Sequence, residues 1–388
     1  MSKKEKNPNL RKPKGKRGSK ALLIVLIILL VLAIAAIVTY AVFDQMSKTA
    51  PSVDTSVPWS QNTNTDTDPQ NIKRYEDYYN FLVVGKDNVA LNTDVMMLIN
   101  LNLNEGGSMT IMQLPRDTLV NYNGQVCKLN SMYSRFYNAS DKKKDSDRIN
   151  EAMQGLTGFL AESLAIKIDY YANLNLDAFG KVVDAIGGVD MYVPYRMQYE
   201  DTNQVPPLHI DLYEGQQTLD GDKAQQFVRF RNSYVSGDLG RTDAQKLFMT
   251  AFIESFKNKI TVAKLPSVVS TILGNLTHSV PLDDATYFAR QALEMDFSNM
   301  TMLTAPNTEI NYYGSYVVLH RAAMYKIINE NFNMYSSSIP EESFDINKLF
   351  TVTNNYSINS IYMTTQEFDG EYSVDEIQDN GIDVPRAW

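Results

Sequence analysis

The alternation of apolar and polar positions along the chain predicts a body of mixed strands and helices. Short apolar runs at 81–85, 94–103 and 108–115 have the length and the turn boundaries of buried strands. Apolar residues then recur at helical spacing over 148–166. Together these segments predict an α/β fold with a central mixed β-sheet flanked by helices.

The pattern continues with strands and helices in alternation. Residues 169–177 read as a strand that leads directly into a helix, with Asp177 expected as its N-cap and the glycine pair at 187–188 as its stop. Helical patterns also cover 221–229 and 238–258. No internal repeat is evident, so we expect one body, not a repeat array.

One apolar stretch is too long for a globular core. Residues 21–43 hold no charged side chain, and as a helix they would span about 34 Å, enough for a bilayer core of about 30 Å. Nine of the lysines and arginines lie in residues 1–20, directly before it. By the positive-inside rule, we expect a single-pass cell-membrane protein with a cytoplasmic N-terminus and an extracytoplasmic C-terminal domain.

Composition divides the rest of the chain. Residues 44–78 are rich in Ser, Thr, Asn, Asp and Pro and predict an extracytoplasmic stalk. Residues 79–334 form the predicted α/β body. Residues 335–388 lack strong periodicity, and we expect a flexible or loosely packed C-terminal extension.

Charge and cysteine content limit the possible functions. The net charge is −9, but residues 1–20 alone carry +8, which leaves 27 cations against 44 anions, or −17, for the remainder. A body this acidic repels phosphate backbones, so nucleic acid is excluded as a partner. The single Cys127 excludes an intramolecular disulfide and any multi-cysteine metal site. Any anionic ligand must therefore be held by a local cationic site.

Two polar clusters lie at the ends of predicted strands. Asp87 follows one strand and Asp94 precedes the next, so the two carboxylates could converge on a hard cation; an ordinary polar loop is the alternative. Arg116 and Asp117 follow Pro115 at the exit of a third strand, where α/β sheets commonly bind ligands. A purely structural ion pair between Arg116 and Asp117 is the alternative there.

A third cluster is rich in arginine. If 227–231 is extended, Arg229 and Arg231 share one face, and two neighbouring guanidinium groups repel each other unless an anion lies between them. Arg241 follows near the start of a helix, with Gln245 on the same helical face. Arginines that pair with surface carboxylates are the alternative. Taken together, the arginines suit a pyrophosphate.

The order of these motifs carries a resemblance to a known family. The chain begins with a basic tail, one apolar helix and a stalk. These are followed in order by GKD, TD before an apolar strand, PRDT, RFR, GDLGR and a glutamine. This order resembles the LytR-CpsA-Psr family over about residues 79–334. The resemblance implies a phosphotransferase that moves an anionic glycopolymer, such as teichoic acid or capsule, from a polyprenyl-pyrophosphate carrier to peptidoglycan.

The resemblance also implies roles for individual residues. Asp87 and Asp94 would hold Mg²⁺, or Mn²⁺ in its place, and Asp117 would orient arginines or act near the metal. The pyrophosphate would be bound by Arg116, Arg229, Arg231, Arg241 and Gln245. Arg116, Asp117, Arg229 and Arg231 form the expected catalytic set, and the polyprenyl tail would lie in an apolar tunnel between sheet and helices.

This chain departs from the family pattern at two cationic positions. Asn92 stands where an arginine is usual, and Ala244 where a basic residue is frequent. Arg135 is a candidate to compensate. The missing cations keep two other functions open: a polyprenyl-pyrophosphate phosphatase or carrier-lipid binder, and a noncatalytic scaffold or regulator of wall assembly.

Overall fold

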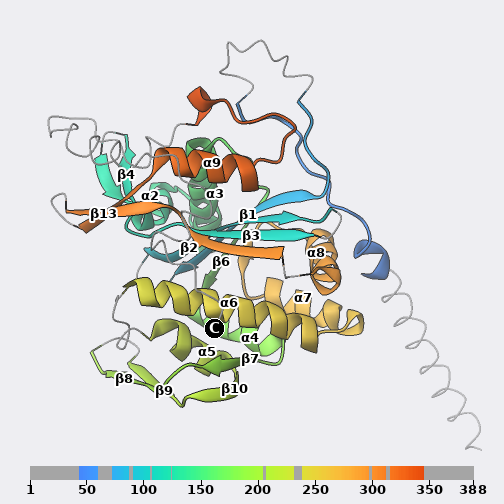
Figure 1. Ribbon diagram of the computed structural model, residues 1–388, viewed down its shortest axis with the longest axis vertical. Coiled ribbons are helices and arrows are strands. Elements are labelled where there is room, and N and C mark those ends of the chain that lie inside the picture. The colour runs from blue at the N-terminus through green and yellow to red at the C-terminus, as the bar shows by residue number, and fades with distance from the viewer. Residues whose placement is uncertain are drawn as a thin grey trace, which may run out of the picture.

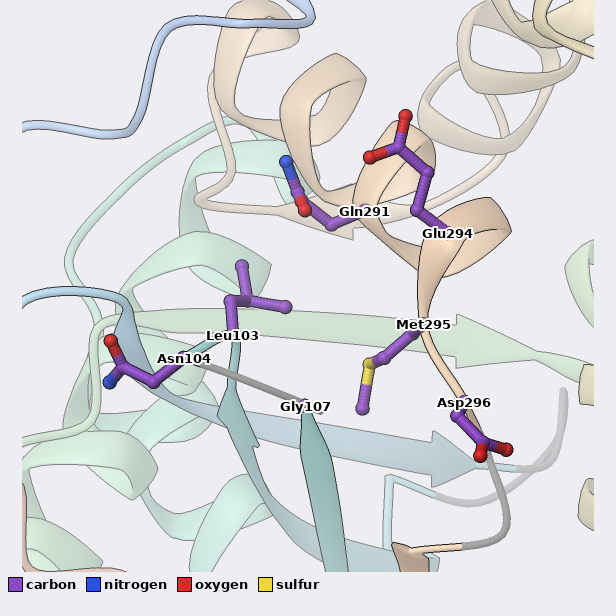
Figure 2. Close-up of a pocket in the computed structure, with 7 residues that line it drawn as sticks. All are labelled: Leu103, Asn104, Gly107, Gln291, Glu294, Met295 and Asp296. Carbon is purple, nitrogen blue, oxygen red and sulfur yellow. The ribbon is translucent and has the colours of Figure 1, made fainter.

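The computed structural model shows an α/β protein built around one mixed sheet (Figure 1). It describes residues 43–59, 72–86, 91–104, 107–123, 125–203, 207–230, 238–296, 299–311 and 315–344. Within these residues no helix is both long and apolar enough to cross a bilayer. The predicted membrane segment, 21–43, lies outside them except for Phe43.

Six strands form the central sheet in the order β11-β6-β1-β2-β3-β12. β1, β3, β6 and β12 run in one direction, and β2 and β11 run against them. The predicted mixed sheet and its first three strands are therefore confirmed. The bounds are β1 (Tyr78–Lys86), β2 (Thr93–Asn102), β3 (Ser108–Gln113), β6 (Tyr170–Asn175), β11 (Thr277–His278) and β12 (Met300–Thr304).

Helices cover both faces of this sheet (Figure 1). One face carries α2 (Met132–Ala139), α3 (Asp145–Leu164) and α9 (Arg321–Asn331). On the other side lie α4 (Leu176–Ala185), α5 (Gly221–Arg229), α6 (Asp238–Lys259), α7 (Leu265–Leu273) and α8 (Leu282–Glu294). The smaller elements are β4 (Leu119–Tyr122), β5 (Gln125–Lys128), η2 (Leu129–Ser131), β7 (Val189–Val193), β8 (Met197–Asp201), β9 (Leu208–Leu212), β10 (Gly215–Leu219), η3 (Val262–Lys264), β13 (Asn307–Asn311), β14 (Ser315–Leu319) and η5 (Glu341–Ser343).

The ends of α4 show how local sequence sets an element. Its N-cap is Asn175, whose side-chain oxygen accepts a hydrogen bond from the Ala178 amide at 2.8 Å. The expectation that Asp177 is the cap is therefore wrong, because the strand ends two residues earlier, at Asn175. Asp177 lies in the first helical turn, where its charge interacts favourably with the helix dipole. Gly187 and Gly188 follow the helix with φ of 83° and 80°, which confirms the predicted stop.

Buried apolar side chains form two separate cores. The first lies between the sheet and α2, α3 and α9, and includes Leu82, Leu98 and Leu156. The second lies among α4–α7 and the β7–β10 strands, and includes Phe227 and Phe248. No strand residue of the central sheet belongs to this second core among the described residues.

A layer of half-buried apolar side chains separates the second core from the sheet. α6 turns Ala244, Phe248 and Ala251 into the second core, whereas its Thr250 hydroxyl lies 3.7 Å from the Met302 sulfur on the sheet. The cross-strand register places Met302 in one row with Ile111, Ile99, Phe81 and Tyr170. This row lies on the face that carries α6 and α8, and its Phe81 and Tyr170 rings pack against Phe288 of α8. Phe81, Val83, Val95, Ile99, Leu174 and Met302 are only half-buried and belong to neither core.

Residues 43–59, here called the N-terminal strap, lie against the body. Phe43 is buried in the second core, and the Asp44 carboxylate pairs with the Arg290 guanidinium of α8 at 2.8 Å. At the other end, Trp59 packs edge-on against Tyr335 with ring centroids 5.2 Å apart. This part of the predicted stalk, 44–78, is therefore folded onto the domain.

The start of the C-terminal extension is also packed. Tyr335, Ile339 and Phe344 are buried in the first core, and the Tyr325 hydroxyl donates to the Ile339 carbonyl at 2.7 Å. The structure thus extends the body to residue 344, ten residues beyond the predicted boundary at 334. These three apolar side chains lie in irregular backbone and are not spaced with the period of a helix or a strand. Periodicity in the sequence therefore does not predict that they are buried. Residues 345–388 lie outside the described part.

Arg290→Ala is expected to detach the first part of the strap. Arg290 donates from Nη1 to Asp44 and to the Ser47 hydroxyl, and its removal leaves the buried Ser47 and the Asp44 charge without that donor. Amide hydrogen exchange over 44–49 should become faster in the variant. Arg321→Ala, which removes an ion pair of the same length to Glu341, should leave that exchange unchanged. Equal exchange in Arg290→Ala and wild type would contradict this role.

The same contact sets the pH range of strap docking. Hydrogen bonds from Lys48 and Arg290 hold the pKa of Asp44 below its usual value. The docking contribution of a carboxylate with a lowered pKa is complete above its ordinary value and is lost as the pH falls through the lowered one. The strap should therefore stay docked at neutral pH and loosen only in acid.

Candidate anion-binding site

Several charged side chains meet at one edge of the central sheet. Because β1, β3 and β6 are parallel, their carboxyl ends share an edge with the start of the antiparallel β2. This edge carries Lys86 at the end of β1, Asp94 at the start of β2 and Arg116 just after β3. The sheet therefore brings together residues that are up to 30 positions apart in the chain.

Arg116 lies between two carboxylates. Its Nη1 donates to Asp94 Oδ1 at 3.0 Å, and its Nε lies 3.5 Å from Asp117 Oδ2. The arginine side chain is 25 % exposed and that of Asp94 40 %. Arg116 and Asp117 lie at the exit of β3, as predicted, and the ion pair between them, which was the alternative to a ligand-binding role, is also observed. Asp117 contacts the guanidinium in the way an orienting carboxylate would.

The backbone around Arg116 is fixed by hydrogen bonds. Thr118 donates to the Pro115 carbonyl from its amide at 3.1 Å and from its hydroxyl at 2.7 Å, which closes a turn directly after the strand. The Asn130 amide donates to the Arg116 carbonyl, and the Val317 amide to the Asp117 carbonyl, each at 2.9 Å. The charged pair is therefore held on a rigid loop by two distant segments.

Two lysines at this edge were not singled out from the sequence. Lys128 Nζ, at the end of β5, pairs with Asp117 Oδ1 at 2.8 Å and lies 5.6 Å from the Tyr316 ring centroid. Lys86 Nζ lies 5.3 Å from the centroid of the buried Tyr133 ring. Burial raises the pKa of Tyr133 to about 12, so this ring stays neutral. Neither lysine belongs to an arginine-rich motif, and only the hairpin and sheet place them here.

The arginine cluster is folded differently from the extended segment considered above. Arg229 is the last residue of α5, where a cation favours the helix dipole, and only Phe230 is extended. Arg229 therefore does not lie on a strand, because the helix that buries Phe227 and Ala224 continues to position 229. Arg229 is half-buried; Arg231 lies outside the described residues.

The remaining predicted ligands are placed only in part. α6 begins at Asp238, so Arg241 and Gln245 lie near its start, four residues apart on one helical face as predicted. Nothing is described of their side chains, and Asp87 lies outside the described residues. The described residues contain no group of three or more His, Cys, Asp or Glu side chains that could hold a metal.

The positions that depart from the family pattern differ in environment. Asn92 is exposed directly before β2, at the charged edge. Ala244 is buried in the second core, so a longer side chain at this position would have to leave that core to reach any ligand. Arg135 donates to the Gln125 amide oxygen at 3.0 Å on the β4–β5 side.

The half-buried apolar layer leads to the charged edge. Val95, Gly85 and Leu174 form the last cross-strand row before Lys86, Asp94 and Asn175. An amphiphile with an anionic end would match this order of apolar layer and cationic edge. The fold and this edge define a class of α/β proteins in which an apolar sheet face ends at a charged edge.

Comparisons with known proteins agree with this class. The LytR_cpsA_psr family model matches residues 42–333, and the chain belongs to that family. It is 27 % identical to the cell wall biosynthesis protein LcpA of Corynebacterium glutamicum over 58 % of this chain and 45 % of that protein. It is 23 % identical to the polyisoprenyl-teichoic acid–peptidoglycan teichoic acid transferase TagV of Bacillus subtilis over 54 % of this chain. The chain spans about half the length of these two curated relatives.

Solved structures share the fold. The crystal structure of TagV from Bacillus subtilis aligns with a TM-score of 0.51 at 21 % identity, covering 65 % of this chain and 94 % of TagV. A structure of TagT bound to LI-WTA aligns with a TM-score of 0.50 at 20 % identity, covering 73 % of this chain and 96 % of TagT. At these identities the likeness establishes the fold alone.

Proposed function

We propose that the protein is a membrane-anchored phosphotransferase that moves an anionic glycopolymer from a polyprenyl-pyrophosphate carrier to peptidoglycan. The main observation in support of this proposal is the cationic edge around Arg116, which lies at the end of the half-buried apolar layer. Family membership supports it, as do the teichoic acid transferase activities for which TagV and the Oceanobacillus iheyensis TagU are named; this TagU is 25 % identical over 56 % of this chain.

The apolar layer would hold the polyprenyl chain. Val83 and Ile99 are half-buried on the face that carries α6 and α8, as is Phe81, which packs against Phe288 of α8, and Leu174 continues this surface to the edge. Covering such surface releases about 25 cal/mol for each Å². Burial of apolar surface can therefore bind a long isoprenoid chain, while its pyrophosphate stays at the polar edge.

Arg116 would bind the pyrophosphate through its planar guanidinium. It is already oriented by Asp117 and by the hydrogen-bonded turn, so little side-chain entropy is lost when it binds. Further side chains would neutralise the charge that develops as the phosphoryl group leaves the carrier phosphate. They are Arg229, Arg231, Arg241 and Gln245. Lys128 would keep Asp117 in place.

The described residues offer a partial fit for Mg²⁺ or Mn²⁺. Asp94 is a carboxylate at the correct edge, partly exposed, and its ion pair with Arg116 uses Oδ1. Asp94 and Asp87 would hold the ion, which when bound supplies positive charge next to the phosphate oxygens. Asp94 therefore has two competing partners, Arg116 and the metal.

A phosphatase or carrier-lipid binder is the second candidate. Asn92 is exposed at the charged edge and adds no cation there, so the edge holds the pyrophosphate with fewer charges than the family pattern provides. With water in place of a sugar hydroxyl, the same site would release phosphate. A noncatalytic scaffold is the remaining alternative.

A labelled carrier substrate separates these functions. Full-length protein in detergent is given a radiolabelled sugar linked to polyprenyl pyrophosphate, purified peptidoglycan and Mg²⁺. Label appearing in peptidoglycan is the expected result. Release of label only into soluble phosphate products would favour the phosphatase, and an unchanged substrate would favour the scaffold. Chelation of the metal should abolish the transfer.

A further inference from the structure

Two exposed tyrosines lie on the small lobe of β7–β10, and the hydroxyl of Tyr192 contacts Glu214, the residue after Tyr213. Tyr192 is 54 % and Tyr213 68 % exposed, which makes them the two most exposed large apolar side chains among the described residues. Tyr192 projects outward because its neighbours Met191 and Val193 are buried in the second core. Tyr213 directly follows β9, and Glu214 separates it from β10, the partner strand of β7. We call this surface the tyrosine face.

Polar partners hold both rings in place without covering them. The Arg196 guanidinium carbon lies 4.0 Å from the Tyr213 ring centroid, and Arg196 is itself paired with Asp211. The Tyr192 hydroxyl donates to Glu214 Oε1 at 3.3 Å. Rings that are already fixed lose little entropy on binding, and such tyrosines are effective contact residues for this reason.

An amide and a hydroxyl side chain share the exposed side of the ribbon with Tyr192. Gln216 lies opposite Tyr192 in the ladder, and Thr218 lies opposite Asp190, all on the exposed side. The Thr218 hydroxyl donates to Asp190 at 2.5 Å. Flat apolar rings beside hydrogen-bonding groups suit a sugar ring, which has apolar C–H faces and hydroxyl edges.

Charge selects the kind of glycan. The outward side chains of this four-strand lobe include the carboxylates of Asp190, Glu200, Asp211 and Glu214. Lys259, His209 and Arg196 each pair with one of the first three carboxylates. Lys259 and Arg196 offset two of the four carboxylates, so the surface keeps a small negative charge, which disfavours a polyanionic glycopolymer and accepts neutral sugars and amino groups.

We propose that the tyrosine face binds the glycan strand of peptidoglycan, the acceptor in the reaction. The proposal rests on the proposed function, which supplies peptidoglycan as partner. The lobe is joined to the helix that carries Arg229, because the Asp211 amide donates to Gln226 of α5 at 2.8 Å. Binding here would therefore hold the acceptor on the same structural unit as that arginine.

Cosedimentation with peptidoglycan stripped of teichoic acid tests the surface. The double variant Tyr192→Ala and Tyr213→Ala in full-length protein is expected to bind about tenfold more weakly than wild type, because it lacks both rings. Tyr75→Ala is the matched control, since Tyr75 is 47 % exposed and lies far along the chain beside Tyr78. Tyr213→Trp, which keeps an aromatic ring, should retain binding and shows that a loss is not caused by misfolding. Equal binding of the double variant and wild type would overturn the proposal, as would competition by purified teichoic acid.

Kinetics separate this proposal from the proposed function. In the labelled transfer assay, the double variant should show a raised KM for peptidoglycan with kcat unchanged. If wild type binds peptidoglycan through the two tyrosines but transfers no label, the proposed function fails and the binding surface stands. If wild type transfers label and the double variant has the same acceptor KM, the tyrosine face fails and the function stands.

Discussion

Arg116→Ala is expected to lower the rate of glycopolymer transfer by about 10²–10³-fold, the usual loss when one donor to developing charge is removed. Arg116 is the arginine that the structure fixes most fully at the charged edge, with Asp94 and Asp117 on either side. Its loss removes the cation and leaves two carboxylates facing the substrate phosphates. The measurement is single-turnover transfer of label from the lipid-linked substrate at saturating metal.

Two further variants sharpen this test. Arg116→Lys keeps the charge but not the planar fork, so it should recover only part of the rate. Arg135→Ala removes an arginine that pairs with Gln125 away from the charged edge, and it should transfer like wild type. Thermal unfolding of each variant checks that the fold is intact. Transfer by Arg116→Ala at the wild-type rate would remove Arg116 from the site.

Asp169→Ala is expected to reduce the free energy of unfolding by about 3–5 kcal/mol, because it leaves a buried arginine unpaired. Arg74 and Asp169 form a bidentate ion pair: Nη1 of Arg74 donates to Oδ1 of Asp169 and Nη2 donates to Oδ2, both at 2.8 Å. Their side chains are only 2 % and 4 % exposed. Asp169 also accepts from the Asn80 amide, so the pair links the chain before β1 to the start of β6.

The measurement is chemical or thermal unfolding of the detergent-solubilised protein. Asp141→Ala is the control, because its ion pair with Lys142 is long, at 3.7 Å, and its side chain is 91 % exposed; the expected change is about 0.5 kcal/mol or less. Combining Arg74→Met with Asp169→Leu should recover part of the lost stability, since neither charge then remains buried. A single variant as stable as wild type would show that the buried pair contributes nothing.

Local pattern was sufficient for the elements that depend on neighbouring residues. The runs at 81–85 and 94–103 became β1 and β2, and the glycines at 187–188 ended α4, because alternation, apolar runs and left-handed backbone are short-range properties. The helical pattern at 221–229 is confirmed by α5, so Arg229 is not extended, and Phe227 reaches the second core from a helix.

Contacts between distant segments could not be read in this way. Lys128 reaches Asp117 only because β5 pairs back on β4, and Trp59 meets Tyr335 across 276 positions of the chain. The strap was assigned to a polar stalk because its composition is polar. A few apolar side chains at its ends are enough to dock it. The average composition of the segment does not show these few residues.

The sequence by itself determined the α/β class, the first strands, the motif order of the LytR-CpsA-Psr family and the residue types that could bind a pyrophosphate. Only the tertiary structure decided which of these residues meet. The sheet order β11-β6-β1-β2-β3-β12 brings the end of β1, the start of β2 and the exit of β3 to one edge, where Arg116 pairs with Asp94. Strand pairing is set by burial and hydrogen bonding between distant segments, whereas the elements themselves follow from local periodicity and turns.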